Sequence, residues 1–296
     1  MKVFVTGASG FIGSAIVQEL LAAGHQVLGL ARSDEAIAKV TSAGAEAHRG
    51  SLDDLDSLHS AAAASDGVIH TAFMHDFSNF MRSTQADLRA VETIGAALEG
   101  SGKPFVVTSG ILMLAMLGRP VTEEDMSDPA VPRVASEYAA IALAERGVRS
   151  SIVRLPPSVH GEGDHGFVST LINIARAKGV SAYPGDGLNR WPAVHRLDAA
   201  HLFRLALESA PAGSRLHGVA DDGIPVREIA NVIGRRLDVP VVSVPVEEAS
   251  DHFGFLGNFF SQNSQASSTL TQHQLGWLPV QPTLLADLDH EYYFTE

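Results

Sequence analysis

The stretch VTGASGFIGSA, residues 5–15, carries three glycines at equal spacing, Gly7, Gly10 and Gly13. It follows a short apolar run and opens a segment with apolar residues at helical spacing. Between a strand and a helix, the first glycine permits a tight turn, the second lets a diphosphate approach the backbone, and the third lets the helix pack on the strand. The free N–H groups at the helix start then bind the anion. We therefore predict a dinucleotide site here; the alternative is a glycine-rich structural turn.

Outward from this stretch, the first half of the chain alternates between the periods of strands and helices. Apolar runs predict strands at residues 2–6, 26–31, 45–49, 67–72, 104–109 and 149–155. Apolar residues at helical spacing predict helices at residues 11–24, 35–43, 53–65, 79–100 and 133–146. Such alternation is typical of a parallel sheet covered on both faces. We predict an α/β fold, a Rossmann-type doubly wound parallel sheet.

Beyond residue 155 the alternation loosens, and proline, glycine and aromatic residues become frequent. Residues 195–209 are helical in pattern and are expected to return to the sheet. We assign residues 1–155 to the dinucleotide-binding Rossmann domain, with 190–219 returning to it. Residues 156–189 and 220–296 are expected to form a smaller C-terminal α/β lobe that binds the substrate.

The composition narrows the class of partner. The chain has 296 residues, a formal net charge of -13 and 0 cysteines. So acidic a chain is a poor partner for nucleic acid or an anionic membrane, because it would oppose its own field. The absence of cysteine excludes disulfides and thiolate chemistry. With no apolar run of membrane-spanning length and no secretory pattern, we expect a soluble, cytoplasmic protein that acts on a small molecule.

Several segments resemble the extended and atypical short-chain dehydrogenases/reductases, the NAD(P)-dependent epimerase/dehydratase-like superfamily. TGASGFIG, residues 6–13, resembles the TGxxGxxG motif of that superfamily. DGVIHTAF (66–73) and VVTSG (106–110) are similar to its fourth- and fifth-strand motifs. VRLPPSVHG (153–161), AVHRLDAA (193–200) and LGWLP (275–279) resemble its RPxxVYG, VHVDDVA and LGWxP segments. Together they cover most of the chain.

The end of the second strand favours NADP(H) as the cofactor. An acidic residue there would bind the adenosine ribose of NAD, whereas an arginine accommodates the 2′-phosphate of NADP. Here Arg32 and Ser33 follow the strand, and the first acidic residue, Asp34, comes later. A planar guanidinium suits a phosphate. The alternative is a solvated surface arginine.

The resemblance implies further cofactor contacts along the edge of the sheet. Ser51 and Leu52 stand where the family has its adenine-side Asp. The full set of expected cofactor-binding residues is Gly7, Ser9, Gly10, Phe11, Ile12, Gly13, Arg32, Ser33, Ser51, Leu52, Thr71, Ala72, Phe73, Thr108, Arg133, Pro156 and Val159.

The catalytic residues depart from the family pattern. Short-chain dehydrogenases use a Tyr-xxx-Lys pair and a Ser, and the Lys lowers the pKa of the Tyr so that it exchanges a proton as hydride moves. Alignment on Glu137, which stands 17 residues before Arg154, puts Pro129 at the Tyr position and Arg133 at the Lys position. The chain therefore resembles an atypical subgroup that lacks the Tyr-Lys pair.

Three residues are candidates for catalysis: Ser109, Arg133 and Tyr138. Arg133 cannot act as an ordinary acid, because its pKa lies above about 12. It can bond the nicotinamide ribose or stabilise charge on a substrate oxygen; a salt bridge with Glu137 is the alternative. Ser109 can orient a substrate or merely tie down the strand end. Tyr138 is a candidate proton donor, although such a phenol more often packs, and water is another source.

Large side chains bordering the expected cleft suggest an apolar substrate. The candidate substrate contacts are His75, Leu112, Met113, Phe167, Tyr183 and Trp191. His195, Asp198 and His201 have a spacing that can place metal ligands on one helix face. We expect no metal, because two of the three fall in the segment that resembles VHVDDVA.

The leading function is an NADP(H)-dependent oxidoreductase that acts on a small, mostly apolar carbonyl, imine or alcohol. One alternative is an NAD(P)-dependent epimerase or dehydratase that retains and recycles its cofactor. The other is a non-catalytic NADP(H)-binding redox sensor, which the missing Tyr favours. A homodimer through the helices near 79–100 and 133–146 is a further expectation.

Overall fold

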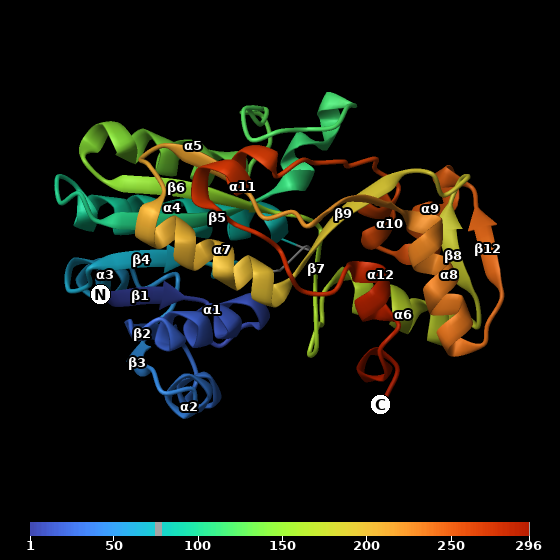
Figure 1. Ribbon diagram of the computed structural model, residues 1–296, viewed down its shortest axis with the longest axis horizontal. Helices are drawn as coiled ribbons and strands as arrows, with labels where there is room; N and C mark the ends of the chain where they lie inside the picture. Colours follow the sequence, from blue (N-terminus) through green and yellow to red (C-terminus); the bar gives the residue numbers. More distant parts are fainter. Residues whose placement is uncertain (75–78, 296) are drawn as a thin grey trace.

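The computed structural model describes residues 1–74 and 79–295. A seven-stranded sheet with strand order β10-β6-β5-β4-β1-β2-β3 dominates the larger part (Figure 1). All its pairs are parallel. Its strands are β1 (Lys2–Thr6), β2 (Gln26–Ala31), β3 (Glu46–Arg49), β4 (Gly67–His70), β5 (Pro104–Gly110), β6 (Arg149–Leu155) and β10 (Ser214–His217). The strand order reverses between β1 and β4, the place where ligands bind in open parallel sheets.

Helices cover both faces of this sheet, which confirms the predicted Rossmann-type fold. One apolar core joins the sheet to α1 (Phe11–Ala22), α2 (Asp34–Ser42) and α7 (Arg196–Ser209). The other joins it to α3 (Leu55–Ala63), α4 (Phe80–Leu98) and α5 (Val134–Ala142). The expected strands and helices are confirmed to within a few residues, because the strands are nearly all apolar and the helices have one apolar face.

A smaller part lies at the other end of the molecule, on the right in Figure 1. It holds a three-stranded sheet of order β11-β9-β7 and a two-stranded sheet of β12 and β8. These strands are β7 (Ser158–His160), β8 (Ser181–Pro184), β9 (Arg190–His195), β11 (Asp221–Pro225) and β12 (Val241–Val244). The helices beside them are α6 (Phe167–Lys178), α8 (Val226–Leu237), α9 (Ala249–Phe253), α10 (Leu256–Phe260) and α12 (Leu284–Leu288).

This smaller part has an apolar core of its own, built from residues between 167 and 294. The return to the large sheet begins with α7, which packs along α1, and continues with β10, which pairs with β6. β9 itself pairs with β7 and β11 in the small sheet. That the smaller part binds the substrate stays a prediction.

The segment that follows α11 (Thr269–Leu275) is fastened to the large part by one buried residue. Trp277 is fully buried, and its indole N–H donates to the carbonyl of Asp198 at 3.0 Å. The Asp198 carboxylate in turn accepts from the backbone N–H groups of Val280 and Gln281, each at 3.0 Å. The segment resembling LGWxP therefore has a structural role, because it attaches the C-terminal part of the chain to α7. Within the described residues, no helix is long and apolar enough to cross a membrane.

Candidate functional site

The three glycines of the first loop are needed for three different reasons. Gly7 has φ +72, and a Cβ there would lie 2.7 Å from Thr71 Oγ1 and 2.9 Å from the N–H nitrogen of Ala72. A Cβ on Gly13 would lie 2.0 Å from the Gly7 carbonyl oxygen, so α1 could not approach β1. A Cβ on Gly10 would meet only that same oxygen, at 3.2 Å. Gly10 is exposed, and its missing side chain leaves room for a ligand above the loop.

The start of α1 suits an anion. Gly10 is its N-cap, no side chain caps the helix, and no acidic residue stands in its first turn. The N–H groups of Phe11 and Ile12 therefore lack partners within the helix and face the end where the helix dipole is positive. The Arg196 guanidinium lies 4.7 Å from the centroid of the Phe11 ring and adds positive charge beside this end. The loop thus fits the diphosphate of a dinucleotide.

At the end of β2, Arg32 and Ser33 are both exposed. Ser33 is the N-cap of α2 and accepts a hydrogen bond from the Ala36 N–H at 3.2 Å, so its own hydroxyl hydrogen stays available. Asp34 pairs with Arg49. Among the described residues, none binds the Arg32 guanidinium. Arg32 therefore lies at the end of β2, where a bound dinucleotide would have its adenosine ribose, and its guanidinium can bind a ligand there.

The other expected cofactor contacts border the same edge of the sheet. Thr71, Ala72 and Phe73 follow β4 and are partly buried. Thr108, near the end of β5, donates to the His70 carbonyl at 2.8 Å. The remaining members are partly exposed or buried: Ser9, Ser51, Leu52 and Pro156 lie in the loops that follow β1, β3 and β6, and Val159 lies in β7. Their contacts with a cofactor stay predictions.

Arg133 lies beside these residues, at the N-cap of α5. Its guanidinium carbon stands 3.8 Å from the centroid of the Phe73 ring, a cation–π contact. The expected alternative, a salt bridge from Arg133 to Glu137, is wrong, because the Glu137 carboxylate is taken up by Arg154 instead. Removal from water lowers the pKa of Arg133, and the negative charge of Asp87 opposes that shift.

The sequence did not predict a row of buried, hydrogen-bonded side chains that begins beside the glycine loop. The Thr6 hydroxyl accepts from the Ala72 N–H at 3.2 Å and meets His70 Nδ1 at 2.8 Å. His70 Nε2 meets Asp87 Oδ1 at 3.2 Å. The family-like sequence around His70 was a signal that could have pointed to it. Asp87, in the middle of α4, gave no such signal.

Ser109 belongs to a second buried network. Its hydroxyl donates to Glu137 Oε2 at 2.7 Å, and Arg154 Nε donates to the same oxygen at 3.2 Å. Arg154 is fully buried and also meets His217 Nε2 at 3.3 Å. His217 Nδ1 lies 2.8 Å from the Ser267 carbonyl and must donate to it, so Nε2 is an acceptor. This network ties the ends of β5, β6 and β10 together; a catalytic role for Ser109 stays a prediction.

His217 gives the protein a predicted pH dependence. Burial and the Arg154 charge lower the pKa of His217 to about 3. In the unfolded chain the His217 ring takes up a proton near pH 6.5, whereas in the folded chain it does so only near pH 3. Between these two values acidification therefore favours the unfolded chain, so the free energy of unfolding is highest above pH 6.5 and falls as the pH falls toward 3. The full difference is about 5 kcal/mol at 1.36 kcal/mol per pKa unit.

Urea unfolding between pH 4 and pH 7 measures the effect (roughly the range in which His titrates). We expect the free energy of unfolding to fall more steeply with acidification in the wild type than in His217→Gln. Burial raises the pKa of Asp164 to about 6, so protonation of Asp164 stabilises the folded protein as the pH falls. Both proteins contain Asp164, so its contribution cancels when their free energies of unfolding are subtracted. Parallel curves would show that His217 is not held neutral.

The candidate proton donor Tyr138 is partly buried, and its hydroxyl donates to the Ser127 carbonyl at 2.9 Å. The hydroxyl hydrogen of Tyr138 is therefore already used in a hydrogen bond within the protein. Pro129, which takes the Tyr position of the family, has no proton to give. Neither residue supplies an evident acid, and a catalytic role for Tyr138 stays a prediction.

The candidate substrate residues do not share one surface. Leu112 and Met113 lie in the 3-10 helix η2 (Ile111–Leu117) after β5, close to the sheet edge, and are partly exposed. Phe167 and Tyr183 are partly buried members of the second core. Trp191 is 0% exposed and packs edge-on against Phe260 at 5.0 Å, so the expectation that it lines a substrate surface is corrected: it fills the core. His75 lies outside the described residues.

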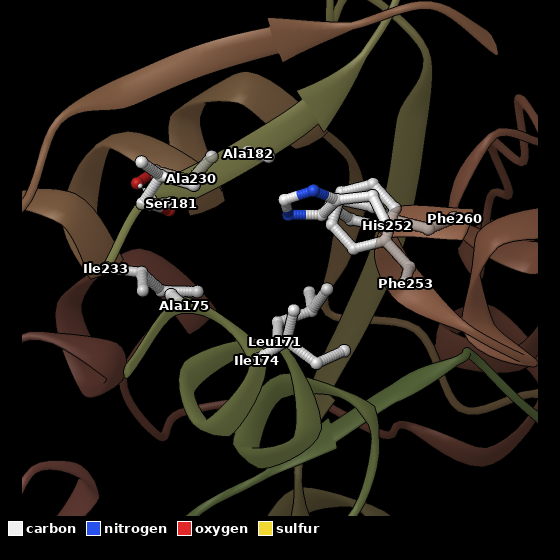
Figure 2. A pocket seen from close by; sticks show the side chains of 11 residues that line it. Leu171, Ile174, Ala175, Ser181, Ala182, Ala230, Ile233, His252, Phe253 and Phe260 are labelled. Carbon is white, nitrogen blue, oxygen red and sulfur yellow. Dashed lines mark hydrogen bonds between the residues drawn. The ribbon is translucent and has the colours of Figure 1, made fainter. Parts of the chain in front are cut away.

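A small cavity of about 10 Å³ lies within the second core (Figure 2). It has room for about one water molecule, far less than a substrate needs. Figure 2 shows the His252 ring facing it among apolar side chains, and His252 Nε2 has no hydrogen-bond partner within the described chain. Burial lowers the pKa of His252. The cavity is a packing gap rather than the active site.

The three residues weighed as metal ligands have separate tasks. His195 accepts from the Leu197 N–H at 3.2 Å, Asp198 accepts from the Val280 N–H at 3.0 Å, and His201 Nδ1 lies 2.8 Å from Glu19 Oε1. Across residues 1–74 and 79–295, no three His, Asp or Glu side chains gather so that they could hold a metal ion.

Comparison with known proteins agrees with this geometry. The chain matches the NAD dependent epimerase/dehydratase family over residues 3–217. It is 53% identical over 295 residues to an uncharacterized protein of Schizosaccharomyces pombe, which covers 99% of this chain and 100% of that protein. It is 30% identical to the 4-hydroxy-2-methyl-3-oxo-4-farnesyl-3,4-dihydroquinoline-1-oxide ketoreductase of Stigmatella aurantiaca, over 76% of this chain and 70% of the relative. The solved structure of MoeE5 in complex with UDP-glucose and NAD is similar with a TM-score of 0.79 at 22% identity, over 99% of this chain and 97% of that one. This last likeness concerns the fold.

Proposed function

This chain belongs to the NAD dependent epimerase/dehydratase family, and from that premise we propose that it is an NADP(H)-dependent oxidoreductase. It transfers hydride to or from a small, mostly apolar carbonyl, imine or alcohol. The family prediction made from the motifs is confirmed; membership of the atypical subgroup without the Tyr-Lys pair stays a prediction.

The observation that carries the proposal is the pair of features at the cofactor edge. The glycine loop has space above Gly10 and unpaired amides at the start of α1, where the diphosphate would bind. Arg32, exposed at the end of β2, would bind the 2′-phosphate of NADP. Thr71, Ala72 and Phe73 would border the nicotinamide, which supplies or accepts hydride when bound.

Arg133 would serve the substrate. Among the described residues, none accepts a hydrogen bond from its guanidinium, which stands over Phe73, close to the expected nicotinamide position. In a reduction it would donate hydrogen bonds to the substrate oxygen as negative charge develops there. Because Tyr138 already donates to a carbonyl and Pro129 replaces the usual Tyr, the proton for the product would come from water.

An apolar carbonyl is supported by two further observations. Leu112 and Met113 present partly exposed apolar side chains beside the end of β5. One relative that shares 30% identity is a ketoreductase by name. A sugar nucleotide, such as the UDP-glucose in the MoeE5 complex, would need a second set of cations for its diphosphate.

Turnover tests the proposal. Purified protein is incubated with NADPH and a panel of apolar ketones, aldehydes and cyclic imines, and the loss of the reduced nicotinamide absorbance is followed. We expect consumption of NADPH with members of the panel and loss of that activity in Arg133→Gln. Tight cofactor binding without net consumption on any member would contradict the proposal and would instead fit a recycling epimerase or a redox sensor. A homodimer stays a prediction that sedimentation can check.

Cofactor preference tests Arg32 separately. Arg32→Asp places a negative charge where the 2′-phosphate would lie, and a carboxylate there accepts ribose hydroxyls. We expect the ratio of NADPH to NADH affinity to fall by at least about 100-fold, since loss of the pair and the new repulsion each contribute about tenfold or more. Arg49→Asp is the control, because Arg49 pairs with Asp34 and lies at the neighbouring strand. An unchanged ratio in Arg32→Asp would contradict the choice of NADP(H).

A further inference from the structure

Arg196 places a positive charge against the end of α1 that is itself positive. It is the first residue of α7, and its guanidinium carbon lies 4.7 Å from the centroid of the Phe11 ring. Arg196 Nη2 donates to the Ser14 hydroxyl at 3.4 Å, and that hydroxyl donates to the Phe11 carbonyl at 3.2 Å. Phe11 and Ser14 both belong to the first turn of α1, so the guanidinium packs at the terminus where the helix dipole repels a cation.

The chain itself does not balance this charge. Among the described residues, no carboxylate forms an ion pair with Arg196, and no acidic residue stands in the first turn of α1. Burial lowers the pKa of Arg196, and the Glu162 charge opposes this shift without an ion pair. The guanidinium donates to the Glu162 carbonyl at 2.9 Å, but its Nε–H is buried with no partner within residues 1–74 and 79–295. A half-buried arginine so placed lacks the anion that would offset its cost.

The loop between β7 and α6 encloses the Arg196 side chain. A Cβ on Gly161, which has φ +136, would lie 3.0 Å from Arg196 Cγ and 3.1 Å from its Cδ. A Cβ on Gly163, with φ +83, would lie 3.7 Å from Nη1. From the same loop, the His165 ring packs edge-on against the Phe11 ring, with centroids 5.7 Å apart. The loop therefore holds the guanidinium beside Phe11.

The arginine belongs to this chain and not to the motif that the segment resembles. In AVHRLDAA, residues 193–200, Arg196 stands where the similar segment VHVDDVA has its second valine. A valine would also cover the Phe11 ring, and it would bring no charge to the helix terminus. Packing alone therefore does not require a guanidinium here.

We propose that Arg196 is a further cofactor-binding residue, which binds the diphosphate together with the amides of Phe11 and Ile12. This inference rests on the proposed function, since it concerns the cofactor of the same site. An anion at the start of α1 would attract both the helix terminus and the guanidinium, and it would offset their mutual repulsion. A diphosphate has two charged phosphates, so it offers acceptors to the helix amides and to a second donor.

Calorimetric titrations with NADPH, NADH and adenosine 2′-monophosphate test this assignment in the wild type, Arg196→Gln and Arg196→Lys. We expect Arg196→Gln to lower the affinities for NADPH and NADH alike, each by about tenfold, through loss of a charge-assisted hydrogen bond. The ratio of the two affinities should stay unchanged, unlike in Arg32→Asp. Arg196→Lys keeps the charge and should recover most of the loss. Adenosine 2′-monophosphate has no diphosphate and should bind all three proteins equally.

Arg204→Gln is the matched control. Arg204 lies on the same helix, but it pairs with Glu19 and Glu208, and its replacement should leave both dinucleotide affinities unchanged. The salt dependence of binding gives a second readout, which a purely structural role would not move. NADPH affinity should fall less steeply with sodium chloride in Arg196→Gln than in the wild type, because salt screens one charge contact fewer.

Three results would overturn the assignment. The first is equal dinucleotide affinity in Arg196→Gln and the wild type, including no measurable binding to either. The second is an equal loss of adenosine 2′-monophosphate affinity, which would mean that the whole site is disturbed. The third is the same loss in Arg204→Gln. Because no substrate is present, absence of turnover leaves the assignment standing, and unchanged affinity in Arg196→Gln leaves the proposed oxidoreductase standing.

Discussion

Gly13→Ala is expected to destabilise the protein severely. The new Cβ would lie 2.0 Å from the Gly7 carbonyl oxygen and 2.7 Å from its carbon, so the backbone of the loop must move away from α1. Overpacking of this kind costs about 3 kcal/mol or more, whereas the better helix propensity of alanine returns only about 1 kcal/mol. We expect the melting temperature to fall by about 5 °C or more, measured by calorimetry.

Gly10→Ala is the matched control, and it separates folding from binding. Gly10 has φ -80 and ψ 174, which any residue adopts, and its Cβ would meet a single atom at 3.2 Å. The melting temperature should therefore stay close to that of the wild type. The methyl group would occupy the space above the loop, so NADPH affinity should fall by at least about tenfold. If Gly10→Ala bound NADPH as the wild type does, the diphosphate would not lie over this loop.

The second large effect concerns the buried pair of Glu137 and Arg154. Glu137→Ala leaves the Arg154 guanidinium fully buried with no carboxylate beside it, and it removes the acceptor of Ser109. Removing one partner of a buried pair costs about 3–5 kcal/mol, so the melting temperature should fall by on the order of 10 °C. Chemical denaturation followed by circular dichroism measures the loss.

Glu99→Ala is the control for this variant. Glu99 pairs with Arg146, but about half of each side chain is exposed, 48% and 49%. Water screens such a pair, so its loss should leave the melting temperature close to that of the wild type. Equal effects of the two substitutions would mean that burial does not set the energy of the Glu137 pair.

The sequence was sufficient for the fold because its signals are local. An apolar strand such as Val3–Val5 and a helix such as α1 each show their period within a dozen residues, and the glycine loop between them needs no distant partner to be recognised. The boundaries shift by a few residues where the last turn or strand pair depends on neighbours. β4 stops at His70, for instance, although the apolar pattern continues to Ala72.

The site was harder to predict because its decisive contacts join distant parts of the chain. Glu137 has a plausible partner one turn away in Arg133, yet it binds Arg154 on β6. In the sequence Asp87 is an ordinary polar residue of a helix, and only the fold brings its carboxylate to His70 Nε2. Trp191 in a segment rich in loops resembles a substrate contact, and only the packed second core shows that it is covered.

A calorimetric titration of the purified protein with NADPH, and in parallel with NADH, tests the central claim most directly. The account predicts binding at one site per chain, tighter for NADPH than for NADH, and an NADPH affinity at least about tenfold lower in Gly10→Ala at an unchanged melting temperature. Failure of the folded wild-type protein to bind either dinucleotide, in the reduced or the oxidised form, would contradict it.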